Sequence, residues 1–202
     1  MQKLEFFFDC SSPWTYLAFS RIHDVAAAAG AEIVWRPILV GGGFNAVNPA
    51  LYERRANPDA PQRRYYDKDM QDWARLCGVK ITWLPSVFPV NAVAAMRGAY
   101  AALDAGRLVP YAKAVFEAYW GDDRDISDHA VLKACAETAG LDGDAFLAAL
   151  ATPDIKARLR AATDELIGPG GFGSPTMSIG DDMYFGNDRL PLVAAALAGA
   201  AR

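Results

Sequence analysis

Hydrophobic residues near the start of the chain are grouped first in a continuous run and then at helical spacing. Residues 4–8 form a short, mostly apolar run that is typical of a buried strand. From Tyr16 to Ala29, Leu, Ala and Ile recur at the spacing of a helix, which Gly30 ends. Residues 32–38 follow as a second predicted strand. A strand, a helix and a strand joined by short links predict a βαβ unit whose strands lie parallel.

The middle of the chain shows mainly helical spacing. Residues 50–67 are polar and predict a loop, within which a helix begins near Pro61 and then runs to Cys77. Two prolines exclude a helix over residues 81–89, which we expect to be extended. Beyond them the pattern predicts helices separated by Gly, Pro or Asp breaks, over 90–105, 108–120, 127–139, 142–150 and 153–167.

The last part of the chain returns to short strands. Residues 176–180 and 183–186 predict a hairpin, whose turn is Asp181-Asp182. A helix that is apolar over most of its surface follows at 190–200.

The order βαβ, helices, ββα predicts the fold class. It matches an α/β, thioredoxin-like fold with a large all-helical insertion. We therefore expect residues 1–60 and 168–202 to form the thioredoxin-like domain. Residues 61–167 would form the inserted helical domain.

Composition and charge are those of an ordinary globular protein. The 202 residues are 52% hydrophobic and 22% charged, which is ample material for a core, and the net charge is -4. There is no long basic run to favour nucleic acid, and no apolar stretch reaches the length of a membrane span. The chain enters a strand at once, without a basic and apolar leader, so we expect no secretory signal and a cytoplasmic location.

Cysteine and histidine are too few and too scattered to suggest a disulfide framework or a metal site. Cys10, Cys77 and Cys135 are odd in number and far apart, which fits a reducing compartment. We expect Cys10 and Cys77 to be small buried hydrophobes. His23 and His129 have no nearby Cys or His, so we expect no metal site and no His-dependent triad.

The turn between the first strand and the first helix carries the candidate chemistry. Ser12 is placed to cap the helix, and Pro13 suits its first position. A helix N-terminus favours an anion, and a thiolate is one such anion. Thioredoxin-like oxidoreductases place Cys-x-x-Cys here, but Ser12 and Thr15 hold those positions. Their hydroxyls cannot exchange disulfides, although Ser12 can donate a hydrogen bond to another molecule's thiolate; the alternative is that Ser12 only caps the helix.

Three motifs are spread over nearly the whole chain. They are Phe8-Asp9-x-x-Ser12-Pro13-x-x-Tyr16-Leu17, Phe172-Gly173-Ser174-Pro175-Thr176-Met177 and Phe185-Gly186-Asn187-Asp188-Arg189-Leu190. Together they resemble the 2-hydroxychromene-2-carboxylate isomerases. These are glutathione-dependent enzymes of the DsbA-like, kappa-class glutathione transferase group, and the kappa transferases share the Ser-Pro turn.

The resemblance implies a glutathione site built from all three motifs. Ser12 matches the catalytic serine, whose hydroxyl supports the glutathione sulfur. Ser174 precedes a cis-proline, Pro175, and its backbone pairs with the cysteinyl unit like an added strand. The segment that binds the γ-glutamyl end corresponds to Phe185, Gly186, Asn187 and Asp188. The last two residues also precede a predicted helix, where backbone N–H groups suit a carboxylate; plain helix capping is the alternative.

The resemblance also suggests where an aromatic substrate lies. Asn57 matches an asparagine of the active-site loop, and Trp83 and Pro85 fall where a substrate-contacting wall is expected; core packing is the alternative for Trp83. Residues 41–43 are glycines where the compared isomerases carry an Arg and a Lys for the substrate carboxylate. A homodimer is expected from the family.

Several functions compete at this point. The main hypothesis is cis-trans isomerisation of 2-hydroxychromene-2-carboxylate, or a related intermediate of aromatic degradation, by reversible addition of the glutathione thiolate. A kappa-like transferase would leave the electrophile conjugated to glutathione. A disulfide oxidoreductase is disfavoured by Ser12 and Thr15. A non-catalytic thioredoxin-fold binding protein would turn over no electrophile.

Overall fold

A four-stranded mixed sheet forms the centre of the computed structural model, which describes residues 1–41 and 60–199. The strand order is β2-β1-β3-β4. β1 runs parallel to β2, β3 is antiparallel to β1, and β4 is antiparallel to β3. The predicted βαβ unit and hairpin are thus confirmed. The predicted turn Asp181-Asp182 is wrong by one residue, because Asp182 pairs with Ile179 and the turn is Gly180-Asp181. The strands are β1 (Lys3–Phe8), β2 (Glu32–Pro37), β3 (Thr176–Ile179) and β4 (Asp182–Phe185).

β1 is apolar because it is the inner strand of a covered sheet. Leu4, Phe6 and Phe8 are fully buried, and Phe7 on the other face is 5% exposed. A strand buried on both faces is expected to show a continuous hydrophobic run rather than alternation.

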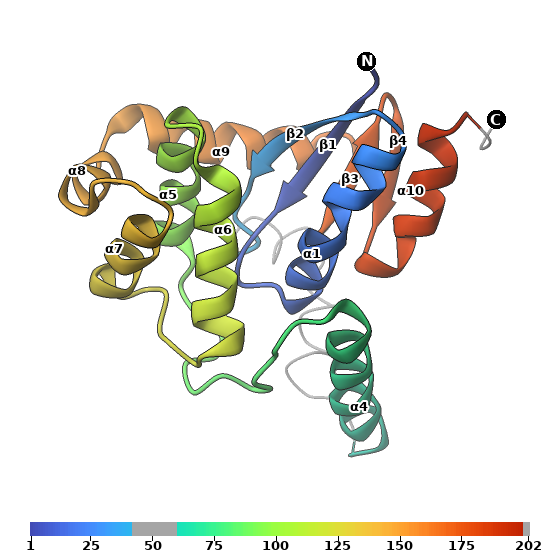
Figure 1. The fold of residues 1–202 in the computed structure, drawn as a ribbon, viewed down its shortest axis with the longest axis horizontal. Helices are drawn as coiled ribbons and strands as arrows, with labels where there is room; N and C mark the ends of the chain where they lie inside the picture. Colours follow the sequence, from blue (N-terminus) through green and yellow to red (C-terminus); the bar gives the residue numbers. More distant parts are fainter. Residues whose placement is uncertain (42–59, 200–202) are drawn as a thin grey trace.

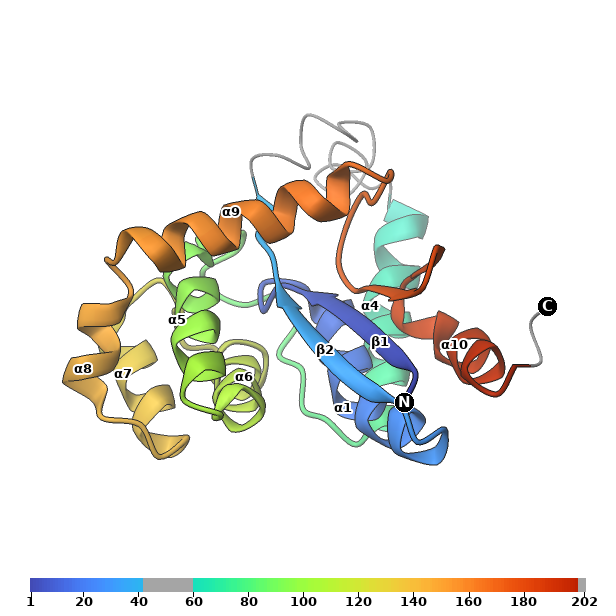
Figure 2. The same ribbon diagram turned by 90° about the horizontal axis from the view of Figure 1, so that it is seen from above.

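Helices cover both faces of this sheet. α1 (Pro13–Ala28) and α10 (Leu190–Leu197) pack together on one face, and α9 (Pro153–Ile167) lies on the other. Figure 2 shows β1 and β2 between α9 on one side and α1 on the other. This arrangement, together with the strand order, is the predicted thioredoxin-like fold.

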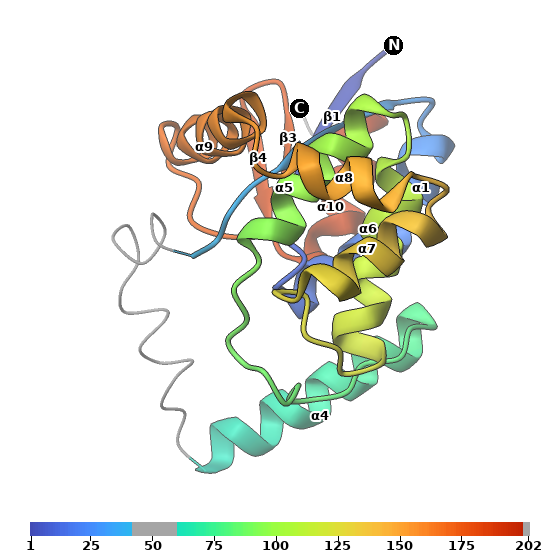
Figure 3. The same cartoon turned by 90° about the vertical axis from the view of Figure 1, so that its left-hand side faces the viewer.

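Most of the helices between β2 and β3 gather to one side of the sheet. α5 to α8 pack against one another (Figure 1). α4 lies apart from them and contacts α1 (Figure 3). The proposed domain boundaries at residues 60 and 167 stay a prediction. The elements are α4 (Ala60–Cys77), α5 (Val93–Asp104), α6 (Leu108–Phe116), the π-helical turn η1 (Glu117–Gly121), α7 (His129–Thr138) and α8 (Gly143–Ala149). None of the helices within residues 1–41 and 60–199 is long and apolar enough to cross a membrane.

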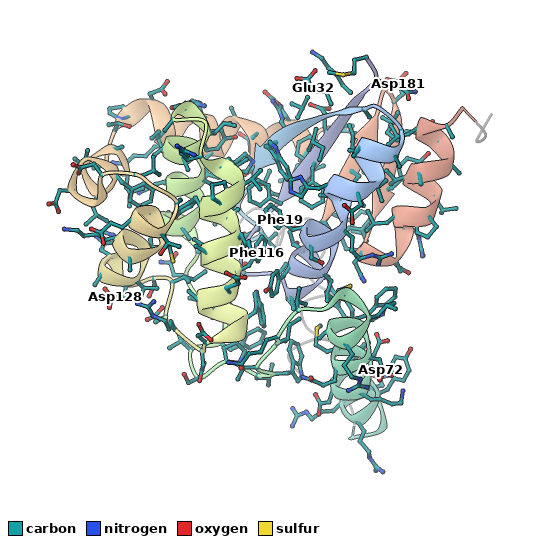
Figure 4. The ribbon with its side chains drawn as sticks, viewed as in Figure 1. Phe19, Glu32, Asp72, Phe116, Asp128 and Asp181 are labelled. Atoms are coloured by element: carbon teal, nitrogen blue, oxygen red, sulfur yellow. The ribbon has the colours of Figure 1, made fainter. Side chains whose placement is uncertain are left out.

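Aromatic side chains join the helical block to α1. Tyr16 stacks on Phe116 of α6, with ring centroids 5.1 Å apart and planes 7° apart. Phe19, one turn further along α1, lies 5.2 Å from the same ring. Figure 4 shows Phe19 and Phe116 between the two helices. The start of α1 is therefore held by the inserted helices as well as by the sheet.

Helix capping, the alternative reading of Asn187 and Asp188, is wrong. Asn187–Arg189 forms a short 3-10 turn, η2, and α10 begins only at Leu190. Neither η2 nor α10 has a side-chain cap. Asn187 is instead buried, with the residue only 3% exposed.

Gly98 provides a test of the packing between α5, α6 and α8. A Cβ atom at this position would lie 2.3 Å from the Tyr111 hydroxyl oxygen and 2.5 Å from Phe146 Cζ. We expect Gly98→Ala to lower the free energy of unfolding by about 1–3 kcal/mol, because overpacking outweighs the better helix propensity of Ala.

Gly168→Ala is the matched control, since Gly168 has helical φ and ψ angles and a Cβ atom there would lie 3.5 Å from the Asp164 carbonyl oxygen, an ordinary contact distance. Urea denaturation should show this control unchanged or stabilised by up to about 1 kcal/mol. Equal stability of the two variants would contradict the packing described for α5.

Candidate active site

Ser12 is the N-cap of α1, as predicted. Its Oγ accepts a hydrogen bond from the Thr15 backbone N–H at 3.3 Å, and Pro13 occupies the first turn. The first turn of α1 carries no acidic residue that would offset the positive end of the helix dipole. The half-buried Ser12 hydroxyl therefore lies at a helix start suited to an anion.

The same hydroxyl also reaches across to the turn before β3. Ser12 Oγ donates to the Ser174 carbonyl oxygen at 3.1 Å. The Ser174-Pro175 peptide bond is cis, as predicted. The Ser174 side chain accepts from the Asp9 backbone N–H at 3.0 Å and lies 2.7 Å from Thr15 Oγ1. We call Asp9, Ser12, Thr15, Ser174 and Pro175 the Ser12–Ser174 junction.

The main chain at this junction has an unused donor. Within residues 1–41 and 60–199, no acceptor is in hydrogen-bond geometry for the Ser174 backbone N–H. The next carbonyl, that of Pro175, accepts from the Gly186 N–H at 3.0 Å. Among the described residues, Ser174 therefore has one N–H without an acceptor and one carbonyl whose sole donor is the Ser12 hydroxyl. The exposed edge of a strand presents the same pair of groups to a peptide.

Asp9 is a buried carboxyl that fixes the turn, and the sequence analysis did not single it out as a site residue. It is fully buried, and its two oxygens accept from the backbone N–H groups of Ser11 at 2.8 Å and Val40 at 2.7 Å. Burial raises the pKa of Asp9, although these hydrogen bonds oppose the shift. Asp9 thus ties the Ser12 turn to the segment that follows β2. A lone Asp between an aromatic strand and a helix cap was the available signal.

The Gly186–Asp188 segment adjoins the junction. Gly186 bonds to Pro175, and η2 packs against α1. Asn187 is buried, yet its Nδ2 has no partner within the described residues. Asp188 is about half exposed and pairs with its neighbour Arg189. A buried amide donor without an acceptor is uncommon and calls for an explanation, and a bound ligand would supply one.

Phe185 packs against the turn that precedes Ser174. It ends β4, and its ring centroid lies 4.5 Å from that of Phe172. A Cβ atom at Gly173 would lie 2.7 Å from the Phe185 ring, so the turn before Ser174 packs directly on this side chain. Phe185 is thus placed to position the turn.

An aromatic cluster borders the junction on the side of the helical block. Trp83 stacks on Trp120, with ring centroids 6.1 Å and planes 19° apart, and its Nε1 donates to Asp67. Trp120 Nε1 donates in turn to the Cys10 carbonyl at 2.9 Å, two residues before Ser12. Phe88, which is 50% exposed, completes the cluster. Trp83 is therefore partly buried and linked to the Ser12 turn through Trp120.

The structure describes one of the two other predicted substrate residues. Pro85 is buried and follows Trp83 by two residues in the chain. Asn57 lies outside the described residues, as do Gly42 and Gly43.

No cysteine of the chain is placed to supply a thiolate at the helix start. Cys10 is fully buried, as predicted, and burial raises its pKa well above the ordinary value. Burial also raises the pKa of Cys135 to about 11. Cys77, which was expected to be buried, is partly exposed at the end of α4. A thiolate beside Ser12 would have to come from a bound molecule.

A separate cleft of about 620 Å³ lies between α1, α6 and the segment after α4. Its charged rim is already paired, with Lys80 3.2 Å from Asp122 and Lys113 3.8 Å from Glu117. None of the junction residues lines it. The cleft also contains a buried imidazole nitrogen, His23 Nε2, that has no partner within the described residues. The junction brings a hydroxyl, a helix N-terminus and an unpaired main-chain N–H together, and it is therefore the better candidate for the active site.

Comparison with known proteins agrees with this picture. The DSBA-like thioredoxin domain family matches residues 3–198. A 2-hydroxychromene-2-carboxylate isomerase of Pseudomonas putida is 30% identical over 199 residues, which cover 96% of this chain and 93% of that protein. The solved structure of a 2-hydroxychromene-2-carboxylate isomerase superimposes with a TM-score of 0.80 and 28% identity, covering 99% of this chain and 96% of the other. A kappa 2 glutathione transferase of Caenorhabditis elegans is 26% identical and covers 96% of this chain and 91% of its own length.

Asp9→Asn should change how stability depends on pH. Between the ordinary value of 3.8 and its raised folded value, Asp9 binds more protons in the folded protein than in the unfolded chain. Ionisation of Asp9 therefore makes the stability of the wild type fall as pH rises through this window. We expect the free energy of unfolding of the wild type, relative to Asp9→Asn, to decrease from about pH 4 to about pH 7. Urea denaturation at both pH values measures this difference, and a difference independent of pH would contradict the assignment.

Proposed function

The chain belongs to the DSBA-like thioredoxin domain family and, within it, groups with the 2-hydroxychromene-2-carboxylate isomerases; we propose that it is a glutathione-dependent cis-trans isomerase. Its substrate would be 2-hydroxychromene-2-carboxylate or a related intermediate of aromatic degradation. The observation that carries the proposal is the Ser12 hydroxyl, held at a helix start and against the main chain of Ser174. We further propose a cytoplasmic homodimer with no nucleic-acid or membrane partner.

The unused groups of the junction suit glutathione. The free N–H and the carbonyl of Ser174 match the main chain of a cysteinyl unit. Asn187 Nδ2 can donate to the carboxylate of a γ-glutamyl end, and the Asp188 carboxylate can accept from its ammonium group. Of these groups, the Ser174 N–H and Asn187 Nδ2 have no partner within the described residues, and glutathione would supply an acceptor for both.

Ser12 would stabilise sulfur rather than attack the substrate. When bound, glutathione supplies a thiolate that adds to a conjugated carbon and later leaves, so that the attacked double bond is single long enough to rotate. Ser12 donates to that sulfur, and the start of α1 adds positive potential. A nucleophilic role for Ser12 would need a base, and the nearest histidine along the chain, His23, is about three turns further along α1.

The aromatic cluster is the proposed wall for the substrate. Trp83 and Phe88 offer ring surface, and Trp120 connects them to the Ser12 turn. A flat aromatic acid would stack on such rings. We propose substrate contacts for Trp83, Pro85 and Asn57. Because residues 41–43 are glycines, the Arg and Lys that bind the substrate carboxylate in the compared isomerases are absent here. Another group would have to bind this carboxylate.

The kappa transferase similarity supports one alternative with the same site. A transferase would release a stable adduct of glutathione and electrophile, whereas an isomerase returns glutathione unchanged. Mass spectrometry of the products separates the two. A protein that binds glutathione but changes no electrophile would be a binding module.

The ultraviolet spectrum of 2-hydroxychromene-2-carboxylate tests the proposed reaction. We expect the protein to accelerate its conversion to the trans isomer only when glutathione is present. Conversion that is equally fast without glutathione would contradict the cofactor, and no conversion despite glutathione binding would contradict the substrate.

Ser12→Ala should separate catalysis from folding. Loss of a hydrogen bond to a charged sulfur is expected to lower kcat/KM by about 10- to 100-fold. Loss of the helix cap and of the hydrogen bond to the buried Ser174 carbonyl should together lower the free energy of unfolding by about 2–4 kcal/mol.

Asp142→Ala is the matched control, because Asp142 caps α8 and is not part of the junction. It should lose the stability of a helix cap, about 1 kcal/mol, and keep full activity. Full activity of Ser12→Ala would contradict the proposed role of Ser12.

Asn187→Ala should weaken glutathione binding while leaving the free protein folded. Its Nδ2 has no partner to lose within the described residues, so the melting temperature without ligand should change little. The dissociation constant for glutathione should rise by about tenfold or more, since a hydrogen bond to a carboxylate is lost. Calorimetry gives both quantities, and unchanged affinity would remove Asn187 from the site.

A further inference from the structure

The Ser12 hydroxyl has one proton, and that proton is already committed. It is donated to the Ser174 carbonyl at 3.1 Å, while the oxygen accepts from the Thr15 N–H. A hydroxyl can donate only one hydrogen bond at a time. A sulfur that needs the Ser12 proton must therefore compete with the Ser174 carbonyl for it.

Loss of this hydrogen bond is unfavourable for the Ser174 carbonyl. Ser174 is only 6% exposed, so its carbonyl has little access to water. A buried carbonyl left without a donor is unfavourable. Release of the Ser12 hydroxyl is therefore favoured only when another donor takes its place at this carbonyl.

A peptide-like ligand can bring that donor. The free N–H of Ser174 sits on the same residue as the carbonyl, so a ligand main chain that pairs with one is in reach of the other. Ser174 itself is fixed by Asp9 and Thr15 through its side chain. The exchange then requires only a rotation of the Ser12 hydroxyl about its Cβ–Oγ bond.

We propose that an amide N–H of the bound ligand replaces the Ser12 hydroxyl at the Ser174 carbonyl and thereby releases this hydroxyl to the ligand's sulfur. This inference rests on the proposed function and names what the site requires of its thiol. The required ligand is a cysteinyl peptide with an amide N–H on the N-terminal side of cysteine. The thiol proton leaves to water, and no covalent bond of the protein changes. A simple thiol at the same helix start would lack the Ser12 hydrogen bond.

Glutathione and its ester analogue test the exchange. In the analogue an oxygen replaces the amide nitrogen between the glutamyl and cysteinyl units, which removes the N–H alone. The readout is the thiol pKa of each ligand, bound at saturation to the full-length protein and free, from the ultraviolet absorbance of the thiolate. In the wild type, binding should lower the thiol pKa of glutathione by about one unit more than that of the ester. In Ser12→Ala the two shifts should be equal.

Affinity gives a second test that needs no thiolate. The S-methyl forms of both ligands are titrated by calorimetry into the wild type and Ser12→Ala. In the wild type, Ser12 can cover the Ser174 carbonyl when the ester binds, so the loss of affinity from amide to ester should be small. In Ser12→Ala nothing covers it, and the loss should be several-fold larger. Ser20→Ala, a serine elsewhere on α1, should behave as the wild type.

The outcomes separate this inference from the proposed function. Equal pKa shifts for the two ligands in the wild type, or an equal loss of affinity in both proteins, would mean that the carbonyl accepts both donors at once. Either result overturns the exchange and leaves the isomerase proposal intact. If glutathione does not bind, or binds with no lowering of its thiol pKa, both proposals fail.

Discussion

The hydrogen bond from the Ser12 hydroxyl to the Ser174 carbonyl joins two turns that are 162 residues apart in the chain. It forms because β1 is an inner strand, with β2 parallel on one side and β3 antiparallel on the other. The C-terminal end of β1 and the start of β3 therefore lie side by side at the same end of the sheet. A helix N-terminus, a hydroxyl and a free main-chain donor come together there. The remaining features either hold this meeting point or shape the space beside it.

Buried polar groups hold the junction in place. Asp9 lies without exposure to water and is satisfied by two backbone N–H groups rather than by a cation. Thr15 and Trp120 add hydrogen bonds to Ser174 and to the Cys10 carbonyl. Buried polar networks that are fully paired rigidify the turn that carries them. Two groups stay unpaired within the described residues, the Ser174 N–H and the Asn187 amide, and both lie at the proposed ligand site.

Local sequence patterns predicted much of this structure, but they did not predict its long-range contacts. The apolar run of β1, the periodicity of α1 and the Ser12-Pro13 signal predicted the strand, the helix and its cap, because each depends on neighbours in the chain. Trp83 stacks on Trp120, which donates a hydrogen bond to the Cys10 carbonyl, and this connection depends on how the inserted helices pack, which local spacing does not encode. Asn187 is of a residue type that commonly caps helices, but it is buried, since the 3-10 turn separates it from α10.

A crystal structure of the protein with glutathione would test the central claim most directly. The account predicts the sulfur within hydrogen-bonding distance of Ser12 Oγ and the cysteinyl main chain paired with Ser174. It also predicts the γ-glutamyl end beside Asn187. Glutathione bound instead in the cleft between α1 and α6, with the junction free of ligand, would contradict the account.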